Sequence, residues 1–323
     1  MGHVQIFALL LMLLVVLTSG QNDIRKPPNI IEPNSPKILY YSLSSYVRIE
    51  CKADGIPQPT YLWKKNGNTI SADTFVQYDS TSGYLTIPDF TKREEGNYMC
   101  VASTAFDNQV GRVIASSLSP PIKLLQTRVE KFADANPTTT GVSEYGYAKL
   151  LCSNKGEVVG SDINTNWYES ENSKDVNMDG GRLFVDSFGD LHFSYALSKD
   201  NTASFKYLCG ISSTSDKLIR LGNLNSLIVT PVPNPTAIRP QLQYSNTGVK
   251  GLRFSKVKLE CVFSGYDTSP PHIPETLWFD DAGKEIVATE KYTFSDDRRI
   301  LYVNIVQESD ERTFFVKAET RLE

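Results

Sequence analysis

The stretch from Cys51 to Cys100 constrains the fold of this chain more than any other feature of its sequence. Trp63 lies between the two cysteines, and Tyr98 precedes the second cysteine by two residues. In a sandwich of two antiparallel sheets, such cysteines join the sheets, the tryptophan packs on their bridge, and the tyrosine ties a loop to a strand. All four residues are in place, so the stretch predicts a disulfide-linked sandwich.

The residues just before Cys51 support this prediction. Val47 and Ile49 alternate with Arg48 and Glu50, which is the period of a strand with one buried and one solvated face. Together, the two cysteines, the tryptophan, the tyrosine and the alternating strand are the pattern of an immunoglobulin-type domain. The same pattern occurs twice more, later in the chain. The predicted fold class is therefore all-β, with tandem immunoglobulin-like sandwiches of the I-set type. Two of them are complete, and the third is degenerate or truncated.

The chain has 323 residues, enough for two or three domains of about 100 to 150 residues each. Pro120-Pro121 marks the first domain boundary, and Pro231, Pro233, Pro235 and Pro240 mark a semi-rigid, extended connector. We expect a signal peptide at 1–20, domain 1 at 27–121, domain 2 at 122–230, the connector at 231–240 and an incomplete domain 3 at 241–323.

The first twenty residues resemble a secretory signal. The run from Ile6 to Leu17 is apolar throughout, shorter than the roughly 20 residues that span a bilayer, and it is followed by Thr18, Ser19 and Gly20. An uncleaved anchor is the alternative, and no later apolar run has membrane length. We therefore expect a secreted, extracellular chain, or one at the plasma membrane if the sequence is part of a longer anchored form.

Domain 2 repeats the plan of domain 1. Cys152 ends an entering strand, Trp167 follows, and Tyr207 precedes Cys209 by two residues. Between them, residues 182–185 and 191–196 are expected to form two short strands joined by a turn.

Domain 3 keeps the register of this plan but changes its end. Cys261 lies in an alternating stretch and Trp278 follows it, while Phe314 and Val316 stand where domain 1 has Tyr98 and Cys100. The core markers predicted for the three domains are Trp63, Tyr98, Trp167, Tyr207 and Trp278.

The five cysteines are expected to meet oxidising surroundings, which favour disulfides. Cys51 with Cys100 and Cys152 with Cys209 are the natural pairs, and each closes a loop of about 50 residues, worth roughly 4 kcal/mol of stability. Cys261 is left unpaired, either as a buried thiol or as a site of intermolecular pairing.

Metal binding by these cysteines is not expected. The sequence has no Cys-x-x-Cys, His192 and His272 stand alone, and His3 lies in the signal. Residues 175–186 do match the calcium-loop formula, but the expected flanks are strands rather than helices, and the last acid is Asp186 rather than a glutamate. We therefore predict a solvated turn there.

Other function classes are excluded by composition and motif. The net charge of −4 gives no basic footprint for nucleic acid. Isolated histidines and a core-facing Cys261 provide no nucleophile with its base, and no glycine-rich phosphate loop occurs, so neither catalytic residues nor cofactors are predicted. Because no Asn-x-Ser/Thr acceptor occurs, the sheets can present bare faces to a protein partner.

The chain resembles the neuroglian and neurofascin-type neural cell adhesion molecules of the immunoglobulin superfamily. The resemblance is carried in domain 1 by residues 53–59, 63–67 and 85–88, and in domain 2 by residues 189–194 and by 199–201 leading to Tyr207. It covers nearly the whole chain after the signal and weakens in domain 3.

This resemblance implies extracellular adhesion, homophilic or with related immunoglobulin-type proteins, in neurite growth and axon guidance. It also implies a horseshoe, in which domain 1 folds on a fourth domain and domain 2 folds on domain 3 about the proline connector. A fourth domain is not present in this sequence. Hemolin, a secreted insect immune protein of related build that binds microbial surfaces and haemocytes, is the alternative.

Overall fold

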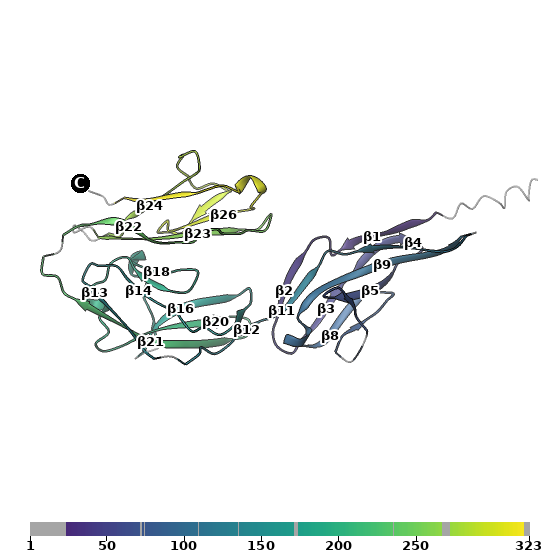
Figure 1. Ribbon diagram of the computed structural model, residues 1–323, viewed down its shortest axis with the longest axis horizontal. Coiled ribbons are helices and arrows are strands. Elements are labelled where there is room, and N and C mark those ends of the chain that lie inside the picture. Colours follow the sequence, from purple (N-terminus) through teal and green to yellow (C-terminus); the bar gives the residue numbers. More distant parts are fainter. Residues whose placement is uncertain are drawn as a thin grey trace, which may run out of the picture. The chain divides into compact units, whose positions relative to one another are not determined.

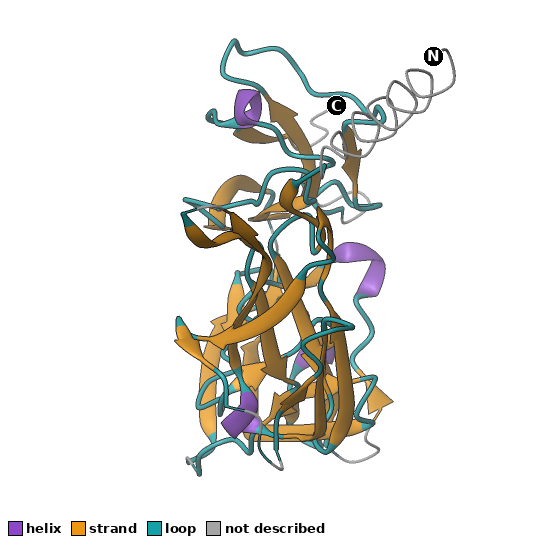
Figure 2. Ribbon diagram, turned by 90° about the vertical axis from the view of Figure 1, so that its right-hand side faces the viewer, coloured by secondary structure: helices purple, strands orange, loops and turns teal. Residues whose placement is uncertain are grey.

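The structure, a computed structural model, describes residues 24–71, 73, 75–108, 110–134, 136–170, 174–234, 236–266 and 272–319. The predicted signal peptide lies outside these residues. The chain divides into two compact units, one ending at Thr127 and the other beginning at Arg128. Strands make up nearly all regular structure of the described residues, and the helical turns are short (Figures 1 and 2). The predicted all-β class is confirmed.

Unit 1 is a single sandwich, which we name the first sandwich. Its elements are β1 (Lys26–Glu32), β2 (Lys37–Tyr41), β3 (Ser45–Glu50), β4 (Lys52–Ile56), β5 (Thr60–Lys65), β6 (Asn68–Thr69), β7 (Gln77–Tyr78), β8 (Tyr84–Phe90), η1 (Lys92–Glu94), β9 (Gly96–Asn108), β10 (Gly111–Leu118) and β11 (Ile122–Gln126). One sheet has the order β2-β11-β9-β5-β6, with β10 also paired to β9, and it is opposed by β3-β8-β7 and β1-β4.

Unit 2 contains two sandwiches. The second sandwich has β12 (Arg128–Val129), β13 (Thr138–Ser143), β14 (Ala148–Leu150), β15 (Val158–Val159), β16 (Ile163–Glu169), β17 (Lys174–Asp175), η2 (Asp179–Gly181), β18 (Leu183–Val185), β19 (Leu191–Phe193), η3 (Ser198–Asp200), β20 (Tyr207–Ser213) and β21 (Leu218–Thr230). The third has β22 (Ile238–Ser245), β23 (Val257–Tyr266), β24 (Glu275–Phe279), β25 (Tyr292–Phe294), β26 (Ile300–Val303), η4 (Glu308–Asp310) and β27 (Phe315–Glu319).

The sheets of unit 2 follow the same two-layer plan. In the second sandwich, β13-β21-β20-β16-β17 faces β14-β19-β18, with β12-β15 as a separate pair. In the third, β22-β23-β26-β25 faces the two-stranded sheet β24-β27. Each sandwich closes on its own apolar cluster.

One tryptophan organises the core of each sandwich in the same way. Its ring nitrogen donates to a backbone carbonyl of the opposite layer, and its register partner on the neighbouring strand is the residue at the second-cysteine position. The three sets are Trp63 with Gly83 O (3.2 Å) and Cys100, Trp167 with Gly189 O (2.9 Å) and Cys209, and Trp278 with Arg298 O (2.8 Å) and Val316. Val316 therefore occupies the place of the missing cysteine.

Disulfides join the two layers in the first and second sandwiches. Cys51 is bonded to Cys100 and Cys152 to Cys209, with Cα atoms 6.3 and 5.6 Å apart. Cys261 is fully buried as a free thiol, and its Sγ lies 3.6 Å from the carbonyl oxygen of Arg299. Burial raises the pKa of this thiol to about 12.

A short helical turn precedes the closing strand of each sandwich. In every case, the carboxylate at the third position of the turn accepts a hydrogen bond from the backbone N–H of the residue three positions earlier. The pairs are Glu94 with Thr91, Asp200 with Leu197 and Asp310 with Gln307. The tyrosine hydroxyl that follows donates back to this acid's carbonyl, Tyr98 to Glu94 at 2.6 Å and Tyr207 to Asp200 at 3.4 Å.

The first domain boundary differs from the prediction. Pro120-Pro121 was expected to end domain 1, but β11 follows directly, pairs with β9 and β2, and buries Ile122 and Leu124 in the first core. The two prolines lie between β10 and β11, which both pair with β9, so unit 1 continues past them and ends at Thr127.

The proline connector is also shorter than predicted. Pro240 belongs to the edge strand β22, where the register between β22 and β23 shifts between Ile238 and Gln241. An edge strand with a bulge tolerates a residue that lacks an N–H. The linking segment between β21 and β22 is therefore 231–237.

The strand of Leu301 and Val303 is short, because β26 ends at Val303. The backbone of Ile305 turns into the left-handed region (φ 51°), and its side chain is 60% exposed.

Candidate functional site

The β9–β10 hairpin is the most exposed apolar feature of the first sandwich. Ile114 is 62% exposed, Leu118 54% and Val113 38%, on a strand whose residues are exposed or half-buried throughout. Among the described strands, β10 forms a ladder only with β9, and β1 lies close to it without pairing. β10 contains neither Lys nor Pro, the residues that commonly block the edge of a sheet. A strand with exposed apolar side chains and no such blocking residue is suited to binding another protein.

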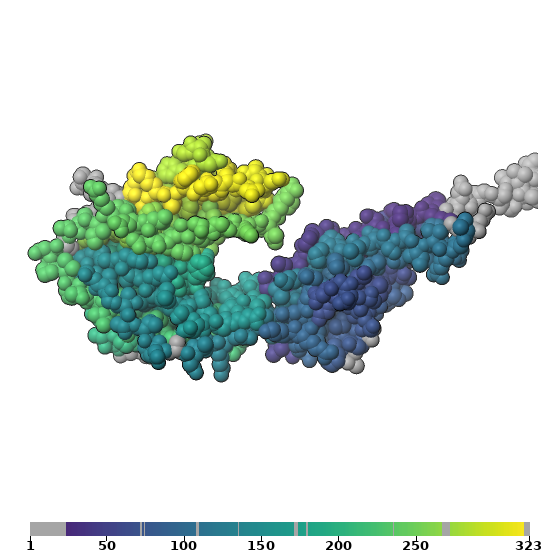
Figure 3. All heavy atoms as spheres, in the orientation of Figure 1, coloured from purple at the N-terminus to yellow at the C-terminus, as the bar shows by residue number. Residues whose placement is uncertain are grey.

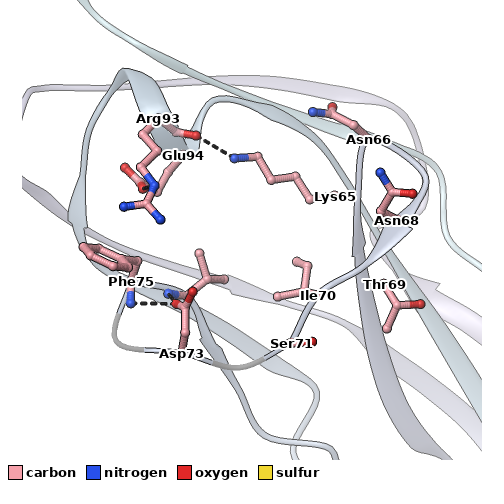
Figure 4. Close-up of a pocket in the computed structure, with 11 residues that line it drawn as sticks. Lys65, Asn66, Asn68, Thr69, Ile70, Ser71, Asp73, Phe75, Arg93 and Glu94 are labelled. Atoms are coloured by element: carbon pink, nitrogen blue, oxygen red, sulfur yellow. Dashed lines mark hydrogen bonds and ion pairs between the residues drawn. The ribbon is translucent and has the colours of Figure 1, made fainter.

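The first sandwich also has an open cavity of about 360 Å³ beside its closing corner (Figure 4). Its charged groups already have partners within the chain. Lys65 Nζ donates to the Arg93 carbonyl at 2.7 Å, the Arg93 guanidinium lies 4.1 Å from the centre of the Phe75 ring, and Asp73 accepts two backbone N–H groups. Burial lowers the pKa of Lys65. The side chains named here hold the corner together rather than converge on a ligand.

The second and third sandwiches of unit 2 touch through a buried polar contact, which we name the clasp. It brings residues of the second sandwich between positions 145 and 195 against β22, β23 and the loop that precedes β26 of the third. Figure 3 shows the atoms of the two sandwiches lying directly against each other.

Glu260, on β23, is the acidic centre of the clasp. Its side chain has no exposed surface, and its Oε2 accepts from the backbone N–H of Ser187 at 2.9 Å and from the Ser187 hydroxyl. Tyr244 of β22 donates to the same oxygen at 3.3 Å, and Lys258 Nζ pairs with Oε1. A buried carboxylate of the third sandwich is thus held by donors from both sandwiches.

Arg299 is the basic counterpart, at a different point of the clasp. It is 2% exposed, and its Nη2 donates to the Ser194 hydroxyl of the second sandwich at 2.9 Å. Its guanidinium also lies 5.6 Å from the centre of the Phe184 ring, and its Nε is 3.9 Å from Asp297. Burial lowers the pKa of Arg299, which Asp297 offsets only in part.

His192, on β19 of the second sandwich, is fully buried. Its Nε2 is 3.0 Å from Asp186 Oδ2, its Nδ1 is 2.8 Å from the Tyr147 hydroxyl, and its ring packs 5.3 Å from that of Tyr244. His192 was predicted to stand alone and instead joins the two sandwiches through Tyr244.

Tyrosines fill the end of the clasp. Tyr266 of β23 is 5% exposed, with ring centres of Tyr145 and Tyr195 at 4.2 and 5.1 Å. Gly265 N donates to the Ser194 carbonyl at 3.4 Å beside them. Aromatic rings of both sandwiches thereby exclude water from this edge.

The residues predicted from sequence do not gather at one site. The five core markers are all buried, each within its own sandwich. Among the described residues, no group of three or more His, Cys, Asp or Glu could hold a metal ion. Asp175 ends β17 and Asp186 begins a turn between β18 and β19, so the calcium-like segment lies between strands.

Sequence reasoning missed the clasp, although one signal was present. On β23, the face opposite Cys261 begins with the charged residues Lys258 and Glu260 and continues with the uncharged residues Val262, Ser264 and Tyr266. These three are buried, as is Glu260. An uncharged end on that face indicates that this part of the strand packs on both sides.

Comparison with known proteins gives three results. A family model described as immunoglobulin domain matches residues 27–104. The chain is 25% identical over 302 residues to neuroglian of Drosophila melanogaster, covering 89% of this chain and 22% of neuroglian. It is 26% identical over 320 residues to neural cell adhesion molecule L1 of Takifugu rubripes, covering 92% of this chain and 22% of L1.

The match to the immunoglobulin domain family therefore covers the first sandwich. The sequence relatives include a neural cell adhesion molecule, and adhesion proteins of the immunoglobulin superfamily are non-enzymatic. Among solved structures, the insect immune protein hemolin matches with a TM-score of 0.64 at 16% identity, covering 92% of this chain and 74% of hemolin. That likeness supports the fold.

The chain spans about a fifth of the length of neuroglian and L1. Within the part of the chain that the structure describes, no helix is both long and apolar enough to cross a membrane.

Proposed function

We propose that this chain is an extracellular cell-adhesion protein that binds through its immunoglobulin-like sandwiches, homophilically or to related immunoglobulin-type proteins, in neuronal adhesion and axon guidance. The observation that carries the proposal is the similarity to neuroglian and L1 along about nine tenths of the chain. Extracellular placement is part of the proposal and accords with the disulfides of the first two sandwiches.

The β9–β10 hairpin is the surface that best fits a protein partner. β10 forms a ladder only with β9 among the described strands, and Val113, Ile114 and Leu118 expose apolar area on it. Strand addition to such a strand gives affinity through main-chain hydrogen bonds and specificity through side chains.

Bead aggregation tests this function. Beads coated with the chain should aggregate or bind beads coated with a neuroglian-like partner, and Ile114→Glu should weaken that binding about tenfold or more, because a buried isoleucine contributes about 1.5 to 3 kcal/mol. Ile228→Glu, at a β21 position that is 50% exposed, is the matched control.

Two results would contradict the proposal in distinguishable ways. If neither kind of bead binds, the adhesion function is wrong. If binding occurs but Ile114→Glu and Ile228→Glu behave alike, adhesion stands and the hairpin is not its surface.

The immune alternative has the hemolin-like fold as its support. Binding of lipopolysaccharide by the chain, in the absence of bead adhesion, would favour that alternative over adhesion.

A further inference from the structure

Residues 246–256 connect β22 to β23 at one end of the third sandwich (Figure 1), and we name this segment the basic loop. Among the described residues of the third sandwich, Leu252 and Phe254 are the most exposed large apolar side chains, at 73% and 65%. Val249 is exposed beside them in the sequence. Single exposed apolar residues are common on protein surfaces, but three on one short loop form a patch that needs an explanation.

The same loop carries positive charge. Lys250, Arg253 and Lys256 are interleaved with the apolar residues, and no Asp or Glu occurs in the loop. The Arg253 guanidinium lies 4.8 Å from the centre of the Phe254 ring, and Lys256 Nζ lies 4.0 Å from that of Tyr302. None of the three cations forms an ion pair within the part of the chain that the structure describes. Their charge is therefore available to an anion outside the chain.

Phe254 is held in a backbone conformation that is unfavourable for a bulky residue. Its φ is 67°, in the left-handed region. It is the third residue of a turn that the Ser255 N–H closes by donating to the Leu252 carbonyl at 2.9 Å, a position where a positive φ normally selects glycine. Backbone strain of this kind is concentrated at functional sites. The chain thus places an exposed phenylalanine where glycine would be the less strained residue.

The base of the basic loop is fixed to the rest of the third sandwich. The Phe254 N–H donates to the Val306 carbonyl at 2.7 Å, and the Val306 N–H donates to the Ser255 carbonyl at 2.8 Å. A Cβ on Gly251 would lie 2.4 Å from Val257 Cγ2, so the loop folds closely back on the start of β23. The exposed apolar side chains of the loop are therefore held in place before any partner binds.

We propose that the basic loop docks the third sandwich on the surface of an anionic phospholipid bilayer. Leu252 and Phe254 enter the boundary between headgroups and acyl chains, where apolar side chains are favoured. Lys250, Arg253 and Lys256 lie against the headgroups and attract their phosphate and carboxylate groups. This docking concerns the third sandwich and does not depend on the adhesive function.

The mixture of apolar and basic residues favours a bilayer over other anionic partners. A sulfated polysaccharide matches the cations but leaves Leu252 and Phe254 in water, whereas a bilayer with anionic lipids accommodates both kinds of side chain. Each cation near such a surface strengthens binding about fivefold. Two exposed acids on neighbouring segments, Glu290 and Glu308, oppose this attraction in part.

Sedimentation of the full chain with phospholipid vesicles tests the proposal. The chain should bind vesicles of phosphatidylcholine that contain one quarter phosphatidylserine, and it should bind vesicles of phosphatidylcholine alone about tenfold or more weakly. High salt should release the chain from the mixed vesicles in part, because it screens the headgroup charge.

Two apolar substitutions test the patch. Leu252→Ser and Phe254→Gly should each weaken binding to the mixed vesicles about tenfold or more, since each removes a large apolar side chain from the interface. Leu221→Ser, at an exposed position of β21, is the matched control and should bind like the parent.

Phe254→Gly also separates docking from folding. Glycine adopts a positive φ without strain, so the midpoint of thermal unfolding should not fall in this variant. Lost binding together with a lower midpoint would mean that Phe254 serves the fold rather than a bilayer.

A triple substitution tests the charges. Lys250→Gln, Arg253→Gln and Lys256→Gln together should weaken binding to the mixed vesicles about a hundredfold. The control removes the same net charge from exposed positions of unit 1, through Lys52→Gln, Arg112→Gln and Lys123→Gln, and should bind like the parent.

A fluorophore reports whether the loop enters the bilayer. An environment-sensitive dye on Val249→Cys, in a Cys261→Ala background, should shift its emission to the blue when mixed vesicles are added. The same dye on Ser204→Cys, an exposed position of the second sandwich, should not shift.

The remaining outcomes overturn the proposal. If the parent does not bind the mixed vesicles, the loop is not a lipid-docking site. If the loop variants bind as well as their controls, a different surface contacts the lipid. If heparin binds the chain and only the triple substitution weakens either interaction, the loop recognises polyanions in general and not a bilayer.

Discussion

At the scale of single residues, the second sandwich depends on a buried ion pair. Arg182 and Asp200 are only 4% and 6% exposed in their side chains and form two parallel bonds of 2.7 and 2.8 Å. Arg182 also donates to the Tyr195 carbonyl at 2.8 Å, and Asp200 accepts the Leu197 N–H. The pair thus connects the β18 side of the sandwich to the corner that precedes Tyr207.

We expect Asp200→Ala to lower the free energy of unfolding of unit 2 by about 3 to 5 kcal/mol, because it leaves a buried guanidinium without its anion. Urea denaturation followed by tryptophan fluorescence measures this. Asp216→Ala, on the β20–β21 turn, is the control. A loss below about 1 kcal/mol would mean that water or a neighbouring group replaces Asp200.

Residue identities also explain where prediction from sequence succeeded and failed. Cysteine, tryptophan and tyrosine mark the cores because each has one demanding role, and the structure buries all five predicted markers. His192 gave no such signal, because its partners Asp186 and Tyr147 are separated from it by 6 and 45 positions in the sequence. Contacts of that kind become visible only once the strands are paired.

At the scale of strands, the alternation of apolar residues located β3 correctly but could not specify what covers the second face of a strand. β23 is the clearest case. Its alternation around Cys261 predicts one buried face, whereas both faces are buried from Glu260 to Tyr266. β11 was assigned to the wrong domain because two prolines look like a linker, whereas they only interrupt the passage from β10 to β11 along β9.

The register of β27 makes the third sandwich repairable. Trp278 pairs with Val316 as Trp63 pairs with Cys100, and both Cys261 and Val316 belong to the third core. Val316→Cys should therefore bridge to Cys261 under oxidising conditions and raise the unfolding free energy by about 2 to 4 kcal/mol.

Mass mapping of non-reduced peptides checks this bridge. The pairs Cys51 with Cys100 and Cys152 with Cys209 should be unchanged in the variant. Lys317→Cys, at the next position along β27, is the control and should stay unbridged because its side chain points to the other face. A free thiol at position 316, or a bridge from 317, would show that the register is wrong.

At the scale of the whole molecule, the contacts of the clasp rather than the length of the connector are expected to hold unit 2 together. Loop closure weakens slowly with length, by about 0.6 kcal/mol for each doubling. Doubling segment 231–237 with a Gly/Ser insertion after Pro233 should therefore keep the narrow distance distribution between the second and third sandwiches at pH 7.5.

Pulsed electron spin resonance measures this outcome, with spin labels at Ser204→Cys in the second sandwich and Ala282→Cys in the third, in a Cys261→Ala background. A matched insertion in the Glu260→Gln background should broaden the distance distribution. The weakened contacts of the clasp then no longer offset the entropy cost of closing the longer connector. If the insertion alone separates the sandwiches, the connector, and not the clasp, determines the closed state.

The distribution of disulfides has a mechanical consequence for a chain that is pulled from its ends. The bonds between Cys51 and Cys100 and between Cys152 and Cys209 close segments of 49 and 57 positions, so about 170 and 190 Å of extended chain stay locked in the first two sandwiches. The third sandwich has no covalent stop, since Cys261 is a free thiol. Under tension, the third sandwich can therefore extend along its whole length once its sheets separate. It is the extensible segment of the molecule.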